Sequence, residues 1–311
     1  MTASGPVDER FCNVGNVELC YQTFGDPGDP AMLMIMGLGT QMIGWHEDLC
    51  AQLAGRGFFV IRYDNRDVGR STRFDDTPPP GVRELLRRRP RNPAYDLGDM
   101  AADAAGLLDC LEIEAAHVVG ASMGGMIAQL LAARHPHRVL SLTSIMSSTG
   151  SRWAGQPALR AYPYLVRSPG ADRDAVVERA VSLFRLVGSQ GFPFDEQGMR
   201  ERAGLSYDRG FNPAGTGRQL AAVLATGLRT GDLKRIKAPT LVIHGTVDRL
   251  VAPSGGRATA RHIPGARLEM IEGMGHDLPR GAWPRIVDLL VEHAHGAQPA
   301  PAASASAAAR G

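Results

Sequence analysis

The feature that most constrains this chain is an alternation, from residue 10 onward, between short apolar runs and longer amphipathic segments. Short apolar runs are typical of buried strands, and amphipathic segments are typical of the helices that cover them. The pattern predicts strands at 17–24, 31–36, 58–63, 116–120, 139–146, 240–244 and 267–271. It predicts helices at 42–54, 97–111, 124–135, 254–263 and 282–293. We therefore expect an α/β fold, with a mostly parallel sheet covered by helices on both faces.

Charge and composition exclude several classes of partner. The 34 Lys and Arg residues nearly balance the 32 Asp and Glu residues, and the formal net charge is only +2. Such a chain has no strong field to attract nucleic acid or an anionic membrane. Its 44% hydrophobic and 21% charged residues are typical of a globular protein. We expect a small-molecule partner, and a cytoplasmic location because the first ten residues contain no apolar run; the oligomeric state is left open.

The pattern divides the chain into a core and an insertion. The predicted core comprises residues 10–149 and 231–296, whereas residues 150–230 contain helical patches but no strand pattern. We interpret residues 150–230 as a helical lid inserted between two core strands. Its many aromatic residues favour an apolar or aromatic ligand. The Ala-, Pro- and Ser-rich tail at 297–311 is expected to be disordered.

Two other features are interpreted as structural. Cys12, Cys20, Cys50 and Cys110 are 8, 30 and 60 residues apart, which matches neither a zinc site nor a redox pair. We expect free, mostly buried thiols and no bound metal. Residues 75–93, which include three consecutive arginines at 87–89, are expected to form a solvated loop.

The strongest chemical signal is the sequence Gly-Ala-Ser-Met-Gly-Gly at residues 120–125. It directly follows one predicted strand and opens the next predicted helix. A serine at such a turn needs strained backbone angles, and the glycines remove Cβ atoms that would clash there. The Ser122 hydroxyl is thereby expected to project above the sheet edge as a nucleophile.

A serine nucleophile needs a base and an acid. His276 lies in a glycine-rich loop after the last predicted strand, whereas His117 and His244 lie within strands and are interpreted as core residues. We therefore expect His276 to accept the proton of Ser122. Asp248 follows another strand by four residues and is expected to orient His276. The order Ser, Asp, His differs from the orders of chymotrypsin and subtilisin.

The negative charge formed on an attacked carbonyl oxygen also needs hydrogen-bond donors. The turn after the strand at 31–36 contains Gly37 and Gly39, which let the backbone approach a substrate closely. We expect the amides of Leu38 and Met123 to form an oxyanion hole, and Gly37 and Gly39 to contact the substrate.

Taken together, these motifs and residues 64–71 (Asp-Asn-Arg-Asp-Val-Gly-Arg-Ser) resemble the α/β-hydrolase superfamily. Within this superfamily, the chain resembles the aclacinomycin methylesterase-like group of bacterial carboxylesterases. The resemblance implies a mostly parallel eight-stranded sheet, an inserted helical lid and a cofactor-free Ser-His-Asp esterase. The sequence departs from the common pattern at Met36, where many members have histidine, and at Asp67, where many have glycine. Asp64 and Arg66 are expected to support the turn that contains Leu38.

The sequence therefore predicts hydrolysis of a carboxylic ester, such as the methyl ester of an apolar or aromatic acid, through an acyl-enzyme. Two alternatives remain open. The same three residues could hydrolyse a lactone or a carbon–carbon bond, or act as a perhydrolase. The fold could also serve as a non-catalytic ligand-binding module.

Overall fold

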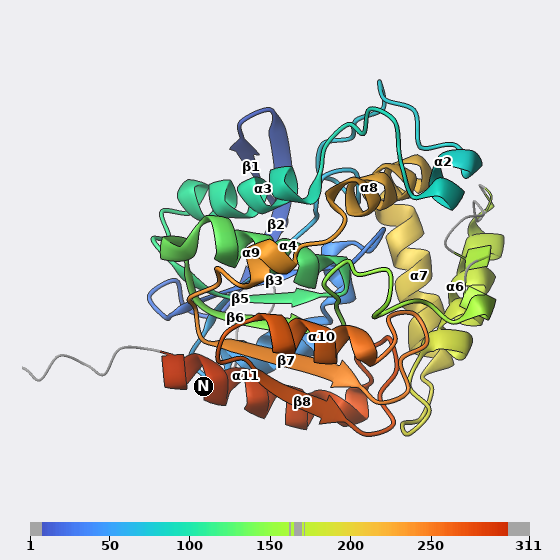
Figure 1. Ribbon diagram of the computed structural model, residues 1–311. Helices are drawn as coiled ribbons and strands as arrows, with labels where there is room; N and C mark the ends of the chain where they lie inside the picture. The colour runs from blue at the N-terminus through green and yellow to red at the C-terminus, as the bar shows by residue number, and fades with distance from the viewer. Residues whose placement is uncertain (1–7, 162, 165–169, 171, 298–311) are drawn as a thin grey trace, which may run out of the picture.

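The computed structural model describes residues 8–297, except 162, 165–169 and 171. Its centre is one eight-stranded sheet in the order β1-β2-β4-β3-β5-β6-β7-β8 (Figure 1). The strands are β1 (Arg10–Val14), β2 (Val17–Phe24), β3 (Ala31–Ile35), β4 (Phe59–Tyr63), β5 (Ala116–Ala121), β6 (Val139–Ile145), β7 (Thr240–Gly245) and β8 (Arg267–Ile271). The pairs β1–β2 and β2–β4 are antiparallel, and every other pair is parallel. The expected mostly parallel sheet is confirmed.

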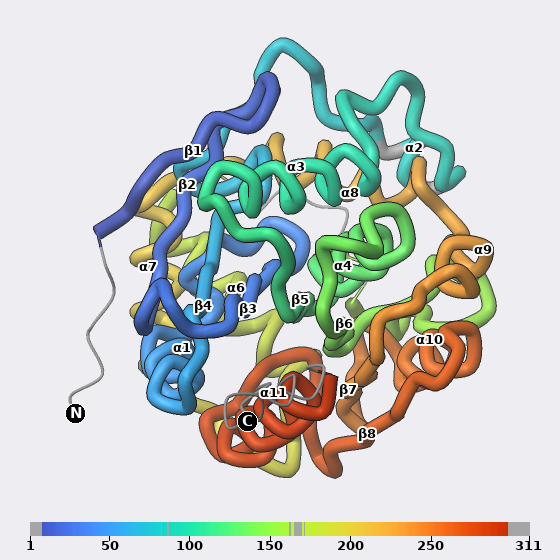
Figure 2. The backbone as a smooth tube through the Cα atoms, turned by 90° about the vertical axis from the view of Figure 1, so that its left-hand side faces the viewer, coloured from blue at the N-terminus to red at the C-terminus, as the bar shows by residue number. Residues whose placement is uncertain are grey.

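Helices cover both faces of this sheet (Figure 2). The helices α3 (Leu97–Cys110), α4 (Met123–Arg134) and α10 (Ser254–His262) lie on one face, and α1 (Glu47–Ala54) and α11 (Trp283–Ala297) lie on the other. The buried apolar side chains accordingly form two clusters, one on each side of the sheet. Every residue of β3 and β4 is buried, as expected for strands covered on both faces. Across the described residues, none of the helices combines the length and apolar character needed to span a bilayer.

The described part of the chain between β6 and β7 contains several helices. It contains α6 (Arg173–Val187), α7 (Glu196–Gly210), α8 (Pro213–Thr226) and α9 (Thr230–Leu233). We call residues 150–230 the inserted segment. Its helices α6 and α7 lie beyond the ends to which the parallel strands point (Figure 1). The only buried residue of α7 is Gly204, so this helix has no apolar stripe that a periodicity analysis could detect.

Several local predictions were wrong. The edge strand β1 was not predicted, because only Cys12 among its five residues is buried. The helix expected at 42–54 is divided into the short 3₁₀ helix η1 (Met42–Gly44) and α1, whose cap His46 accepts a hydrogen bond from the backbone of Asp48. The loop expected at 75–93 contains the helix α2 (Val82–Arg87). The remaining 3₁₀ helices are η2 (Pro136–Arg138), η3 (Leu159–Ala161) and η4 (Arg280–Ala282).

The tail was expected to be disordered from residue 297. Ala297 ends helix α11, and residues 298–311 lie outside the described residues.

The expectation of four free cysteines was also wrong. Cys12 of β1 and the last residue of α3, Cys110, form a disulfide, whereas Cys20 and Cys50 are free and buried. The two bonded residues are 98 positions apart, and such a separation gives no local sequence signal. Disulfides are rare in reducing compartments such as the cytoplasm. This bond therefore does not favour the expected cytoplasmic location, and that location stays a prediction.

We predict that the unreduced protein, once unfolded in urea, exposes two reactive thiols, and that prior reduction raises this number to four. Replacing Cys12 and Cys110 together by serine should lower the free energy of unfolding by about 2–4 kcal/mol, because the bond closes a long loop in the unfolded chain. Thiol titration and urea unfolding measure these effects. Four reactive thiols without reductant would contradict the assignment.

Candidate active site

The backbone of Ser122 is strained at the turn between β5 and α4. Its φ of 56° and ψ of −118° lie where side chains other than glycine are rarely found, at a typical cost of about 1–3 kcal/mol. Neighbouring contacts hold it there. Its N–H donates to the carbonyl of Ile145 at 2.9 Å. A Cβ atom on Gly120 would lie 2.2 Å from the oxygen of Gly124, and one on Gly124 would lie 2.1 Å from the oxygen of Ile35. Only glycine lets strand and helix approach this closely.

His276 lies within hydrogen-bond distance of both other residues predicted to act with it. Its Nε2 lies 3.0 Å from Ser122 Oγ, and its Nδ1 lies 2.8 Å from Asp248 Oδ2. Because a carboxylate can only accept a hydrogen bond, the proton of the neutral ring resides on Nδ1. The lone pair of Nε2 therefore faces the Ser122 hydroxyl. This geometry allows His276 to accept the proton of the serine.

The Asp248 carboxylate is fixed by its own loop. Its Oδ1 accepts hydrogen bonds from the backbone N–H groups of Leu250 at 2.9 Å and Val251 at 2.8 Å. The buried His244 donates from Nε2 to the carbonyl of Val251 at 2.8 Å and lies 3.4 Å from Asp248 Oδ2. Burial alone would raise the pKa of Asp248, but His276 and then His244 outweigh burial and lower it well below its ordinary value. The carboxylate is therefore ionised at neutral pH.

Two backbone N–H groups beside Ser122 have no acceptor in the described part of the chain. Met123 is the first residue of α4, so its N–H has no partner within the helix. The N–H of Leu38 likewise donates no hydrogen bond there. A Cβ on Gly37 would lie 3.1 Å from Ser122 Cβ, which shows how closely this turn passes the nucleophile. By contrast, the N–H of Gly39 is already donated, to Gln219 Oε1 at 2.8 Å.

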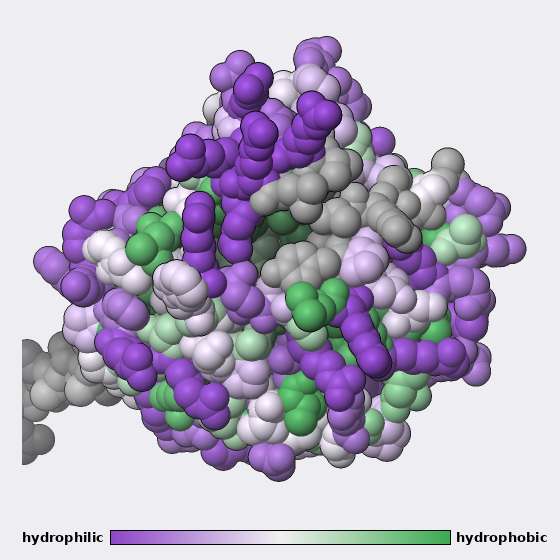
Figure 3. Space-filling model, turned by 45° about the vertical axis from the view of Figure 1, so that its right-hand side comes forward, coloured by the Kyte–Doolittle hydropathy of each residue, from purple (hydrophilic) through white to green (hydrophobic). Residues whose placement is uncertain are grey.

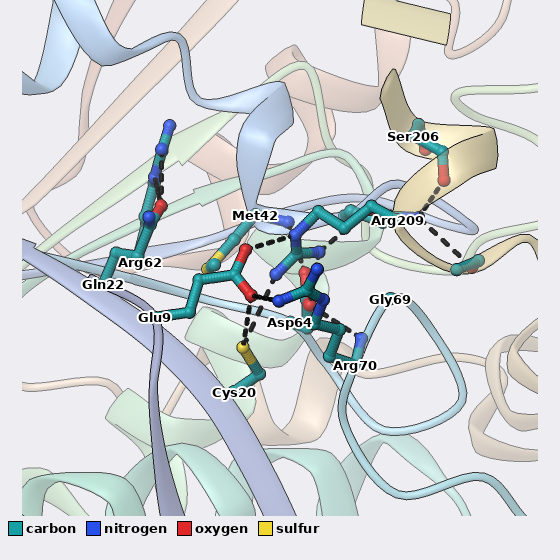
Figure 4. Close-up of polar contacts among 12 residues, drawn as sticks. Glu9, Cys20, Gln22, Met42, Arg62, Asp64, Gly69, Arg70, Ser206 and Arg209 are labelled. Carbon is teal, nitrogen blue, oxygen red and sulfur yellow. Dashed lines mark hydrogen bonds and ion pairs between the residues drawn. The ribbon is translucent and has the colours of Figure 1, made fainter. Parts of the chain in front are cut away.

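Polar side chains of the core hold both ends of the turn formed by residues 36–42, which we call the oxyanion turn. Asn65 Nδ2 donates to the carbonyl of Met36 at 3.0 Å, and Asp64 Oδ1 accepts from the N–H of Met42 at 2.7 Å. Figure 4 shows that Arg209 of α7 also reaches Asp64; the ion pair measures 2.6 Å. The same guanidinium binds Glu9, which precedes β1, at 2.6 Å.

The expected support of the turn is thus made directly by Asp64. Arg66 instead forms a buried bidentate ion pair with Asp103 of α3, both contacts measuring 2.6 Å. Asp67, where many relatives have glycine, adopts a φ of 69° and pairs with Arg218 of α8 at 2.7 Å. Of the two residues that depart from the common pattern, Asp67 is therefore ion-paired with the inserted segment, whereas the Met36 side chain is buried in the core.

The loop that carries His276 is bonded to the inserted segment at the end of α6. The N–H of His276 donates to the carbonyl of Val187 at 2.8 Å. Ser189 Oγ donates to Asp277 Oδ1 at 2.5 Å and accepts from the N–H of Gly275 at 2.9 Å. Burial raises the pKa of Asp277, although Ser189 opposes that rise. These contacts fix the backbone on both sides of the imidazole.

Sequence reasoning did not find the polar residues of the inserted segment that contact the site. Gln219 is fully buried, and it stands in an otherwise apolar stretch of α8, Gln-Leu-Ala-Ala-Val-Leu-Ala. One amide on the apolar face of a helix was the available signal, since buried polar groups require partners. Ser189 had no comparable signal. Over the described residues, no three or more His, Cys, Asp or Glu side chains are grouped so that they could hold a metal ion.

Comparisons with known proteins identify the family. Residues 30–279 match the family described as alpha/beta hydrolase fold. The chain is 31% identical to rhodomycin D methylesterase DauP of Streptomyces sp. (strain C5), over 93% of this chain and 98% of the relative. Rhodomycin D methylesterase DnrP of Streptomyces peucetius is also 31% identical, with the same coverage.

A solved structure shows the same fold. The enol-lactonase from Burkholderia xenovorans LB400 superposes with a TM-score of 0.72 at 23% identity, covering 91% of this chain and 99% of the enol-lactonase. The family match extends over most of the chain. The sheet order and the strained serine between β5 and α4 accord with that match. On these grounds the chain belongs to the α/β-hydrolase fold family.

Proposed function

We propose that this protein hydrolyses a carboxylic ester through a covalent acyl-enzyme, with Ser122 as nucleophile, His276 as base and Asp248 as the group that orients His276. The observation that carries the proposal is the continuous hydrogen-bonded series from Asp248 Oδ2 through the imidazole to Ser122 Oγ. A serine hydroxyl is a weak nucleophile unless a neighbouring base removes its proton during attack. This arrangement supplies that base at hydrogen-bond distance.

The reaction follows from these positions. Ser122 Oγ attacks the ester carbonyl carbon while its proton passes to His276 Nε2, and the carbonyl oxygen gains a negative charge. The free N–H groups of Leu38 and Met123 stabilise that charge. When the carbon–oxygen bond to the alcohol breaks, His276 returns the proton to the departing oxygen. Water then attacks the acyl-enzyme by the same route, which releases the acid and restores Ser122.

The substrate class is proposed from the relatives and the surface. Both rhodomycin D methylesterases act, by their names, on a methyl ester, and the alignment with each covers 93% of this chain. Figure 3 shows a hollow on the side where the inserted helices lie, with hydrophilic residues along one edge and hydrophobic residues inside it. A recess of this character favours an apolar acid. We therefore propose the methyl ester of an apolar or aromatic acid as the substrate, with methanol as the leaving group.

Replacing Ser122 by alanine should abolish hydrolysis of a short p-nitrophenyl ester, because no acyl-enzyme can form. The expected residual kcat/KM is below about one thousandth of the wild-type value. Wild-type protein should react with one equivalent of a fluorophosphonate probe, and mass spectrometry of the digest should find the label on Ser122.

Ser147 provides a matched control for this experiment. It is a buried serine close to Gly125 of α4, and its hydroxyl has no hydrogen-bond partner in the described structure. Ser147→Ala should keep the labelling.

Wild-type protein that neither reacts with the probe nor hydrolyses any ester would support the non-catalytic alternative. A panel of methyl esters, lactones and compounds with a hydrolysable carbon–carbon bond distinguishes ester hydrolysis from the other hydrolytic reactions.

Asp248→Asn should lower kcat by about 10³- to 10⁴-fold, because an amide no longer selects the tautomer with the proton on Nδ1. The neighbouring Asp277 supplies the control, since Ser189 and not His276 is its hydrogen-bond partner. We expect Asp277→Asn to lower kcat by less than about tenfold. Steady-state kinetics on the same ester compares the two variants. Equal losses would show that the orienting role was wrongly assigned.

A further inference from the structure

The oxyanion turn is contacted by two helices of the inserted segment. From α8, Gln219 Oε1 accepts the N–H of Gly39 at 2.8 Å. From α7, the carbonyls of Ser206 and Gly210 accept the side-chain amide of Gln41 at 2.6 and 3.2 Å. Core residues Asp64 and Asn65 hold only the ends of the turn, whereas these contacts reach its middle. The inserted segment therefore takes part in fixing the turn that carries Leu38.

Gln219 makes the contact nearest to Leu38. Its side chain is fully buried, and both ends of its amide are used, since Nε2 donates to the carbonyl of Arg66 at 2.7 Å. Because its neighbours are the N–H of Gly39 and the carbonyl of Arg66, only one orientation of the side-chain amide gives both its oxygen and its nitrogen a partner. Gln219 thus bridges the middle of the oxyanion turn and the core loop that contains Arg66.

The peptide group that follows Leu38 is bonded on both sides. Its N–H, from Gly39, goes to Gln219, and its carbonyl, from Leu38, accepts the Thr40 hydroxyl at 3.2 Å. Gly39 has a φ of 63°, and a Cβ on it would lie only 2.7 Å from Thr216 Oγ1, so α8 covers the turn closely. The peptide that carries the Leu38 N–H is also held, because its carbonyl, from Gly37, accepts the N–H of Thr40 at 3.2 Å. With the peptides on both sides fixed, the backbone dihedral angles of Leu38 have little freedom. The direction of the Leu38 N–H is set as a consequence.

We propose that Gln219 is a positioning residue for the oxyanion hole, and that the hole is complete only while α8 is seated on the oxyanion turn. This inference rests on the proposed function, because it assigns the N–H of Leu38 to the developing oxyanion. Removing the amide leaves Gly39 without its acceptor and lets the turn relax. A donor displaced by about 1 Å from its place in a catalytic site can cost about 100-fold in rate.

The experiment compares Gln219→Leu with Thr226→Val, two substitutions on α8 that each replace a hydrogen-bonding side chain with an apolar one. Thr226 Oγ1 accepts the N–H of Leu97 at 3.0 Å, so its loss also breaks a bond between α8 and the core, but one remote from the turn. We expect Gln219→Leu to lower kcat for a p-nitrophenyl ester about 30-fold with KM changed less than twofold, because only the transition state loses a donor. Thr226→Val should keep kcat within about twofold.

An arylboronic acid gives a second readout. Ser122 Oγ adds to the boron, the serine proton moves to His276, and the resulting anionic tetrahedral adduct occupies the oxyanion hole. Its Kd should rise by about the same factor as kcat falls in Gln219→Leu, and should not change in Thr226→Val. Equal kcat and equal Kd for the two variants would overturn the inference.

Thermal unfolding checks that each variant is folded. Gln219→Asn, which keeps an amide but is one methylene too short, replaces the leucine variant if the latter does not unfold cooperatively. Boronate titration also separates this inference from the proposed function. A wild-type protein that binds the boronate but hydrolyses no ester would contradict the function alone, and weaker binding by the Gln219 variant would still support the positioning role.

Discussion

The site depends on the unfavourable backbone conformation of Ser122. This conformation persists because strand β5 and helix α4 pack so closely that Gly120 and Gly124 leave no room for a Cβ atom. The same close packing places the start of α4 beside the end of β3, and it brings Gly37, the neighbour of Leu38, close to Ser122. Since β7 and β8 run parallel to β5, the loops that follow them reach the same edge of the sheet. Strand direction thus brings distant parts of the chain to one serine.

The shared direction of the strands explains why much of the fold and of the candidate site could be predicted. Ser122, Asp248 and His276 each follow a strand whose apolar run is evident in the sequence, and each lies in a short segment with its own glycine or turn pattern. A parallel sheet then requires the three to share an edge. The turn at Leu38 could be predicted by the same reasoning, because it follows the neighbouring strand β3.

The features that could not be predicted are pairings between residues far apart in sequence. Cys12 and Cys110 are separated by 98 residues, and Gly39 and Gln219 by 180. Neither partner carries a pattern that specifies the other. Strand β1 was missed for a different reason: it lies at the edge of the sheet and buries little, so its sequence lacks the apolar run that identifies a central strand.

The long-range contacts also bear on how the inserted segment can move. Gln219 and Gln41 join it to the oxyanion turn, while Val187 and Ser189 join it to the loop of His276. A rigid swing of α7 and α8 away from the sheet would therefore displace the turn that carries Leu38, and a movement at the end of α6 would displace the loop that carries His276. Substrate exchange that preserves the site must leave these contacts in place. It follows that sequence changes in the inserted segment are best tolerated at positions that bond neither to the oxyanion turn nor to the loop that carries His276.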